Sequence, residues 1–333
     1  MNAVTTKTHQ TNKFKWLLKR EFWENRGGFL WAPLITGAII SILTAVFAVI
    51  GLVRFKNSDA SSDLQFSGNM AEHARQIGGI GDTALLVGIS LTTLVLAFVV
   101  FFYALGCLYD DRRDRSALFW KSLPTSDLQM VLSKATWALL LAPVLSIAIG
   151  VLIGLVLWVI IGLTLAVAGV PGMSAVFTHA HPLSVIGNTL TIVPVYVLWA
   201  LPAVGWLMLC SAWARSKPFL WAVLIPVLAC VIVSMSGILP GMDINYGAVW
   251  YTLVYRGLLS VVPGSWAPAS SAFESNLHNA DNADIQGPAD LMHLMNVSNL
   301  DVLSSPDLWI GAAIGAAFIA AAIYLRRWRE LAD

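Results

Sequence analysis

Long apolar runs separated by shorter polar stretches dominate this chain. Residues 29–53 carry no charge, residues 84–107 form a second apolar run, and residues 135–214 contain no Asp, Glu, Lys or Arg. A helix needs about 20 apolar residues to cross the hydrocarbon core of a bilayer, which is roughly 30 Å thick. The pattern therefore predicts an all-α polytopic membrane protein.

The uncharged stretch divides into two spans at a turn, Val170–Pro171–Gly172. The third span runs from about Ala135 to Ala168 and is predicted to bend at Pro143. At a rise of about 1.5 Å per residue, this run is longer than one membrane thickness, so its helix should tilt or project beyond the bilayer. The fourth span is expected between Asn188 and Trp213.

Two more spans, residues 219–237 and 308–325, bring the prediction to six. Prolines inside spans suggest kinks, which neighbouring helices can accommodate. These prolines are Pro194, Pro202 and Pro226. Two small-residue motifs permit close helix contact, either within one subunit or between two. They are Gly150-x-x-x-Gly154 and Gly311-x-x-x-Gly315.

Residues 238–307 form the longest part without a predicted span and are expected to be an extracytoplasmic or re-entrant lobe. Within them, Gly247–Val262 is apolar but short, and it carries Arg256 near its middle beside several aromatic residues. These features favour an interfacial or re-entrant helix over a seventh span.

The N-terminal 28 residues predict a polar cytoplasmic tail followed by an amphipathic helix over Lys13–Arg26. Apolar residues recur there at helical spacing, with basic residues on the other side, as in helices that lie in the membrane interface. The apolar residues are Phe14, Leu17, Leu18 and Phe22. Gly27–Gly28 is expected to break this helix before the first span.

The basic residues are distributed unequally between the two sides of the membrane. With six spans, sixteen of the 20 Lys and Arg fall on the side of the termini and of the loop 108–134, and four fall on the opposite side. The positive-inside rule then predicts that both termini and this loop are cytoplasmic. We expect a bacterial-type cytoplasmic (inner) membrane.

Composition and motifs exclude several function classes. Charged residues make up 12% of the chain and the formal net charge is +1, so a nucleic-acid partner is not expected. There is no P-loop and no hydrolase or metalloprotease motif, so the chain is not expected to be an enzyme or to hold a cofactor. Its three cysteines lie in apolar runs without pairing spacing, and His179 and His181 without further ligands do not predict a metal site.

The loop Tyr109–Lys134, YDDRRDRSALFWKSLPTSDLQMVLSK, places an apolar cluster beside a run of charges. Pro124 should end a short helix over residues 116–122, and Ser126 with Gln129 forms a capping-box pattern for the helix that follows. An exposed helix with Leu, Phe and Trp in succession is typical of a docking surface. An ordinary loop helix packed on its own protein is the alternative.

Two segments resemble the type-2 permeases of ATP-binding-cassette (ABC) exporters. DRRDRSALFWKSLPTSD, residues 111–127, is similar to the loop between their second and third spans, and KREFWENRGGFLWAPL, residues 19–34, is similar to their N-terminal segment. The resemblance implies that the amphipathic helix is an interfacial elbow. It also implies an ATPase-coupling helix made of Asp114, Arg115, Leu118, Phe119, Trp120, Lys121, Ser122, Leu123 and Pro124.

The resemblance further implies a dimer with a second permease subunit, identical or different, and two cytoplasmic ATPase subunits that bind ATP and Mg. Absence of charge from the predicted spans disfavours a secondary transporter, because such proteins use ionisable groups within the bilayer. A non-transporting membrane scaffold or sensor is the other alternative. The expected organisation is a tail and elbow (1–28), spans 1–5 (29–237), the lobe (238–307), and span 6 with a cytoplasmic tail (308–333).

Overall fold

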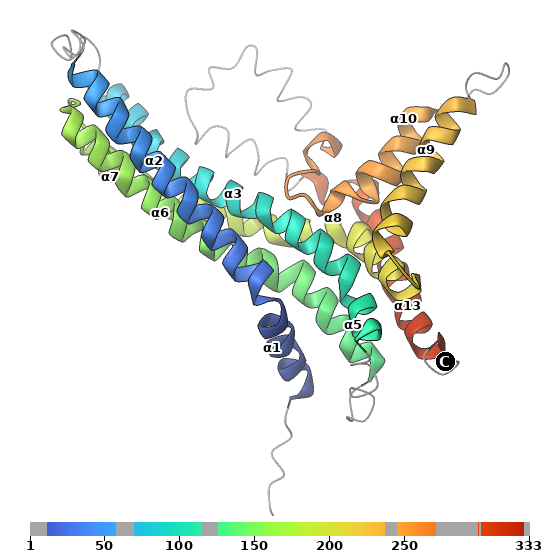
Figure 1. Ribbon diagram of the computed structural model, residues 1–333. Helices are drawn as coiled ribbons and strands as arrows, with labels where there is room; N and C mark the ends of the chain where they lie inside the picture. Colours follow the sequence, from blue (N-terminus) through green and yellow to red (C-terminus); the bar gives the residue numbers. More distant parts are fainter. Residues whose placement is uncertain are drawn as a thin grey trace, which may run out of the picture.

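The computed structural model describes residues 12–57, 70–114, 126–236, 245–270, 299 and 301–329. In these residues the chain consists of helices and connecting turns (Figure 1). Five helices are long and apolar enough to cross a membrane: Lys13–Lys56, His73–Arg113, Asp127–Ala168, Pro182–Trp213 and Pro306–Trp328. The expected all-helical architecture is confirmed at this level, with a shorter apolar helix, Leu220–Met235, where the fifth of six spans was expected.

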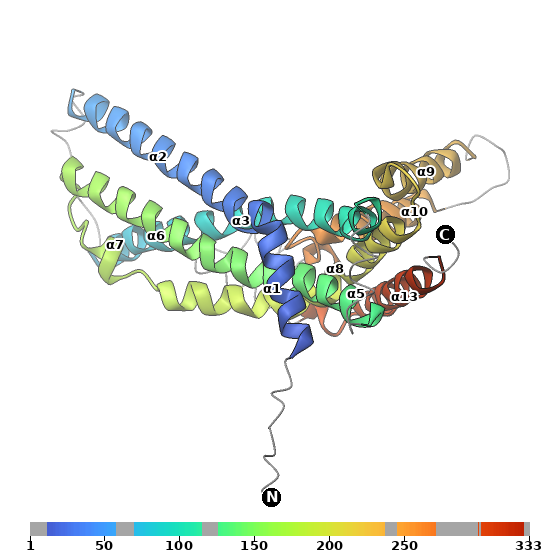
Figure 2. The same ribbon diagram turned by 60° about the horizontal axis from the view of Figure 1, so that its bottom comes forward.

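The chain starts with α1 (Lys13–Arg26), the π-helical turn η1 (Gly27–Trp31) and α2 (Ala32–Lys56), which follow one another without interruption. The predicted break at Gly27–Gly28 is therefore wrong, because Gly27 keeps helical backbone angles. The bend lies at Asn25 instead, where φ is −110° and ψ is 16°, and Figure 2 shows α1 turning away from α2 there.

The second long helix, α3 (Met70–Arg113), starts well before residue 84, where the second apolar run of the sequence begins. Tertiary contacts explain the additional turns. His73 Nε2 lies 3.2 Å from the carbonyl oxygen of Pro171, and Ile77 is buried against Ala175 and Val176 of α7 (Ala175–Thr178). This packing stabilises a segment whose own composition does not predict a helix.

The third helical run joins α5 (Asp127–Thr136), the π-helical turn η3 (Trp137–Leu141) and α6 (Ala142–Ala168). The π-helical turn lies just before Pro143, where the bend was predicted. Gly169 then ends α6 in the left-handed conformation (φ 73°). Gly172, in the turn that follows, has the same φ, and the turn predicted at residues 170–172 is confirmed. The next helix, α8 (Pro182–Trp213), begins six residues earlier than predicted and contains Pro194 and Pro202.

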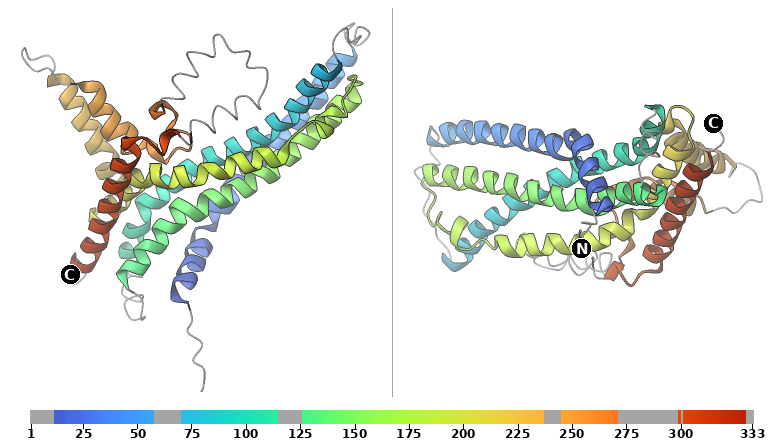
Figure 3. Two further views of the ribbon diagram at one scale, coloured as in Figure 1. Left: turned by 180° about the vertical axis from the view of Figure 1, so that it is seen from behind. Right: turned by 90° about the horizontal axis from the view of Figure 1, so that it is seen from below.

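Glycines allow two helix pairs to cross closely (Figure 3). A Cβ atom on Gly88 of α3 would overlap the backbone of Gly154 of α6, and one on Gly150 would lie 2.7 Å from the Cα of Ile89. A Cβ on Gly205 of α8 would similarly meet the carbonyl oxygen of Gly315 of α13 (Pro306–Arg329). Both small-residue motifs thus serve contacts within one chain.

After a tight turn at residues 214–217, a helical hairpin forms. Its first arm is η4 (Leu220–Leu224) with α9 (Ile225–Ser236), and its second is α10 (Tyr246–Trp250) with η5 (Tyr251–Arg256). The two arms lie side by side in Figure 1, and the indole nitrogen of Trp250 donates to Ser234 Oγ at 3.0 Å. The second arm is too short to cross a bilayer. Two short 3₁₀ turns, η6 (Leu259–Val261) and η7 (Ala267–Ala269), follow it.

Arg256 at the end of this hairpin is buried between helices. Its guanidinium stacks on the ring of Trp199, 3.6 Å from the centroid, and donates to the Trp199 carbonyl oxygen at 2.6 Å. Trp199 lies three residues before Pro202, within the helical turn that loses a hydrogen bond because proline has no backbone N–H. A second hydrogen bond, to the carbonyl oxygen of Asp307 at 3.0 Å, joins the hairpin to α13.

We predict that Gly88→Ala lowers the free energy of unfolding by roughly 1–3 kcal/mol, because the added methyl meets backbone that cannot rotate away. The midpoint of denaturation in detergent micelles measures this effect. Gly51→Ala on α2 is the matched control, since nothing lies within 4 Å of its new Cβ. Equal midpoints for the two variants would contradict the close crossing.

Candidate functional site: a buried charge cluster at the ends of α3 and α5

Four charged side chains from four helices meet at one end of the helix bundle. Each is 9% exposed or less, and together we call them the charge cluster. They are Glu21 of α1, Asp111 of α3, Lys134 of α5 and Arg326 of α13. Two carboxylates and two cations make the cluster electrically balanced.

Lys134 lies between the two carboxylates. Its Nζ is 3.0 Å from Glu21 Oε1 and 3.5 Å from Asp111 Oδ2. The hydroxyl of Tyr103 donates to Glu21 Oε2 at 2.8 Å, so both oxygens of this buried carboxylate have a donor. A buried ion pair is tolerated when such additional hydrogen bonds satisfy its polar atoms.

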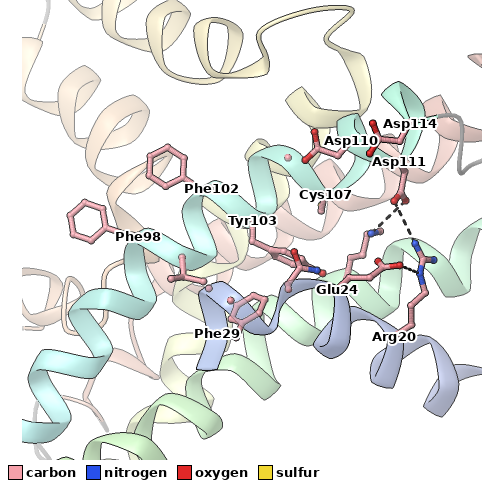
Figure 4. Close-up of a pocket in the computed structure, with 16 residues that line it drawn as sticks. Arg20, Glu24, Phe29, Phe98, Phe102, Tyr103, Cys107, Asp110, Asp111 and Asp114 are labelled. Atoms are coloured by element: carbon pink, nitrogen blue, oxygen red, sulfur yellow. Dashed lines mark hydrogen bonds and ion pairs between the residues drawn. The ribbon is translucent and has the colours of Figure 1, made fainter. Parts of the chain in front are cut away.

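Asp111 connects Lys134 to the C-terminal helix. Arg326 Nη1 lies 3.3 Å from Asp111 Oδ2, and Arg326 Nε lies 3.6 Å from an oxygen of Asp127 at the start of α5. Arg20 of α1 approaches the other oxygen of Asp111 at 3.7 Å, as Figure 4 shows. The two ends of the chain segment 114–126 are therefore linked through Arg326.

Capping interactions fix the same two helix ends. Ser126 accepts a hydrogen bond from the amide of Gln129 at 3.2 Å, which confirms the N-cap half of the predicted capping box. Arg112 donates to the carbonyl oxygens of Ser211, at 2.5 Å, and Ala214, at 3.0 Å. Since these are the last carbonyls of α8, the end of α3 is also attached to α8.

A cavity of about 950 Å³ lies beside the cluster, between α1 and α3 (Figure 4). Its lining changes character along α3, from the exposed rings of Phe98 and Phe102 to the carboxylates of Asp110 and Asp114. Gly28 lets η1 approach α3 here, since a Cβ on it would lie 3.0 Å from Val99. Four of the charged residues around the cavity form ion pairs, an arrangement suited to holding helices together: Arg20, Glu24, Asp111 and Lys134.

The residues predicted for the amphipathic helix do lie on one helix. Leu17 is buried, whereas Phe14, Leu18 and Phe22 are half-buried. The ring of Phe22 packs on Trp137 with centroids 5.7 Å apart, so part of this apolar face is covered by protein. Of the predicted coupling residues, Asp114 is exposed at the cavity. The others lie outside the described residues: Arg115, Leu118, Phe119, Trp120, Lys121, Ser122, Leu123 and Pro124.

The charge cluster was missed by the sequence analysis. One signal for it exists, because Glu21 is one helical turn after Leu17 and therefore lies on the apolar side of α1. Among the described residues, no group of three His, Cys, Asp or Glu side chains could hold a metal ion. The backbone amide of His181 donates to Asp82 Oδ1 at 2.8 Å, which gives this loop a structural role.

Comparison of the chain with protein-family models, curated proteins and solved structures gives no match. In the described residues, the structure is that of an all-helical protein with several helices suited to cross a membrane. Any finer function is inferred from the residues and their contacts.

We predict that Lys134→Met destabilises the protein by roughly 3–5 kcal/mol, because it leaves the buried carboxylate of Glu21 without its cation, whereas Asp111 keeps Arg326. Denaturation in detergent measures the loss. Glu21→Gln combined with Lys134→Met should cost less than the sum of the two single changes.

The control is Glu24→Gln, which removes the half-exposed partner of Arg20 on the same helix. Exposed pairs of this kind contribute roughly 0.3–0.5 kcal/mol. If Lys134→Met were no more harmful than Glu24→Gln, or if the double change were simply additive, the ion pairs would not stabilise the fold.

Proposed function

We propose that this chain is the transmembrane subunit of an ATP-driven ABC transporter of the exporter type. It would pair with a second permease subunit and with two cytoplasmic ATPase subunits, which supply ATP and Mg. Supporting observations are the long apolar helices and the resemblance of residues 19–34 and 111–127 to type-2 permeases. These two segments lie in the same order relative to the apolar helices as in that family.

The observation that carries the proposal is the charge cluster at the ends of α3 and α5. These helices flank the segment that resembles a coupling helix. Through Lys134, Asp111 and Arg326, a displacement of that segment would act on α1 and α13, and through Arg112 on α8. A packed network of this kind is a physical route for coupling ATP hydrolysis to helix movement.

The proposal includes six spans, with α1 as an interfacial elbow. The helix Leu220–Met235 would be the short fifth span, and α10 with η5 would form a re-entrant arm before α13. The distribution of Lys and Arg supports cytoplasmic termini in a bacterial-type inner membrane.

The orientation is testable by cysteine labelling. Cysteines introduced at Ser62 and Asn282 should react with a membrane-impermeant thiol reagent in intact cells, whereas one at Ser116 should react only after permeabilisation. The native Cys107, Cys210 and Cys230 are buried and give low background. Reaction at Ser116 in sealed cells would overturn the orientation.

The coupling role predicts the effect of Phe119→Ala combined with Trp120→Ala. Fully burying one such side chain contributes roughly 1.5–3 kcal/mol, so loss of both should abolish co-purification with the ATPase or uncouple ATP hydrolysis from transport. The permease itself should stay inserted and folded.

Phe98→Ala with Phe102→Ala is a matched control, because these exposed aromatic residues lie within α3, several helical turns before the coupling segment. It should leave ATPase binding intact. Should Phe119→Ala/Trp120→Ala instead lower the thermal stability of the isolated permease while the complex keeps normal coupling, the segment is an ordinary loop helix and the proposal fails.

A further inference from the structure

A second cavity, of about 460 Å³, lies away from the charge cluster between α3, α6, α8 and residues 262–267. Its described lining includes no charged side chain, and most of its wall is aliphatic. Representative residues are Leu86, Ile89, Leu96, Ile147, Ile192 and Val193. Its volume is within the range of sites for small molecules.

Two polar side chains in this apolar wall lack a hydrogen-bond partner. The hydroxyl of Tyr196 and the Nδ2 of Asn299 are shielded from solvent, and neither has a partner among the described residues. The two side chains are 1% and 4% exposed. Buried polar groups are nearly always hydrogen-bonded, so two unpartnered groups at one cavity require an explanation.

The orientation of the Asn299 amide is fixed by its neighbour. The indole N–H of Trp266, which can only donate, points to Asn299 Oδ1 at 2.6 Å. The Nδ2 group is therefore an amide NH₂ with hydrogens to donate. Tyr196 can also donate its hydroxyl proton, so two residues that line this apolar cavity each carry an unused donor.

We propose that this cavity binds a neutral, mainly apolar molecule that carries an oxygen acceptor such as a carbonyl. A small rotation of the Tyr196 and Asn299 side chains would bring their donors into reach of this oxygen, and the apolar body would lie against the aliphatic wall. An ionised ligand is disfavoured because the described lining holds no opposite charge. The site would exist in a transporter and in a non-transporting protein alike.

Benzophenone is a suitable probe, because it is a neutral diaryl ketone that forms covalent bonds with nearby C–H groups on irradiation. The full-length protein in detergent is irradiated over a range of benzophenone concentrations, and labelled peptides are mapped by mass spectrometry. We expect saturable labelling of α3 and α8 around Ile89 and Ile192. Diphenylmethane, which lacks the oxygen, should compete only weakly.

Tyr196→Phe should raise the benzophenone concentration that gives half-maximal labelling by about three- to tenfold, the effect of losing one hydrogen bond. Its thermal stability should be unchanged or higher, since the hydroxyl it removes is unpartnered. Tyr324→Phe, at an exposed position of α13, is the matched control and should label like the wild type.

Three outcomes would overturn the site. One is labelling confined to peptides remote from the cavity. Another is equal half-saturation in Tyr196→Phe and wild type, which would mean that only an apolar filler such as a lipid chain occupies the space. The last is that diphenylmethane competes with an affinity equal to that of benzophenone, since the oxygen would then contribute nothing to binding.

Discussion

The ammonium group of Lys134 and the guanidinium of Arg326 together neutralise two carboxylates that the fold has removed from water. Each charge in this cluster would be costly if it were buried alone, so the four helices that contribute to it are stable together and unfavourable apart. This condition fixes the position of α1 against α5 and of α13 against α3. The arrangement of the bundle at this end follows from electrostatics, whereas further along the same helices it follows from glycine contacts and apolar packing.

The helices themselves were largely predictable, because an apolar run of sufficient length is a local property of the sequence. Helix ends were less so. The start of α3 depends on contacts of His73 and Ile77 with residues about 100 positions away, and the start of α8 on Asp82. Composition near Met70 does not report these contacts. At Gly27–Gly28 the sequence predicted a helix end that does not exist, since glycine also permits the continuous π-helical turn that the chain adopts.

In the candidate site, too, features that depend on neighbouring residues were predictable and features that depend on distant residues were not. Ser126 was recognised as an N-cap because capping depends on residues three apart, and the hydroxyl does cap α5. The partners in the charge cluster are separated by 113 positions for Lys134 and Glu21, and by 215 for Arg326 and Asp111. Periodicity along one helix cannot identify such pairs. Arg256 served in the sequence only as an argument for an interfacial or re-entrant helix, and the partners that stabilise it inside the protein, the ring of Trp199 and two carbonyl oxygens, could not be identified. The coupling residues from Arg115 to Pro124 stay a prediction.

The length of α3 has a mechanical consequence. Its 44 residues, at about 1.5 Å each, extend over roughly 66 Å. Because Gly88 and Gly154 bring α3 and α6 into backbone contact, the two helices form a stiff double rod. A rotation of only about 5° at the end that carries Asp111 would shift the end that carries His73 sideways by roughly 6 Å on a helix of this length. Such a rod amplifies a small angular change into a displacement larger than an atom, without breaking a hydrogen bond along its axis.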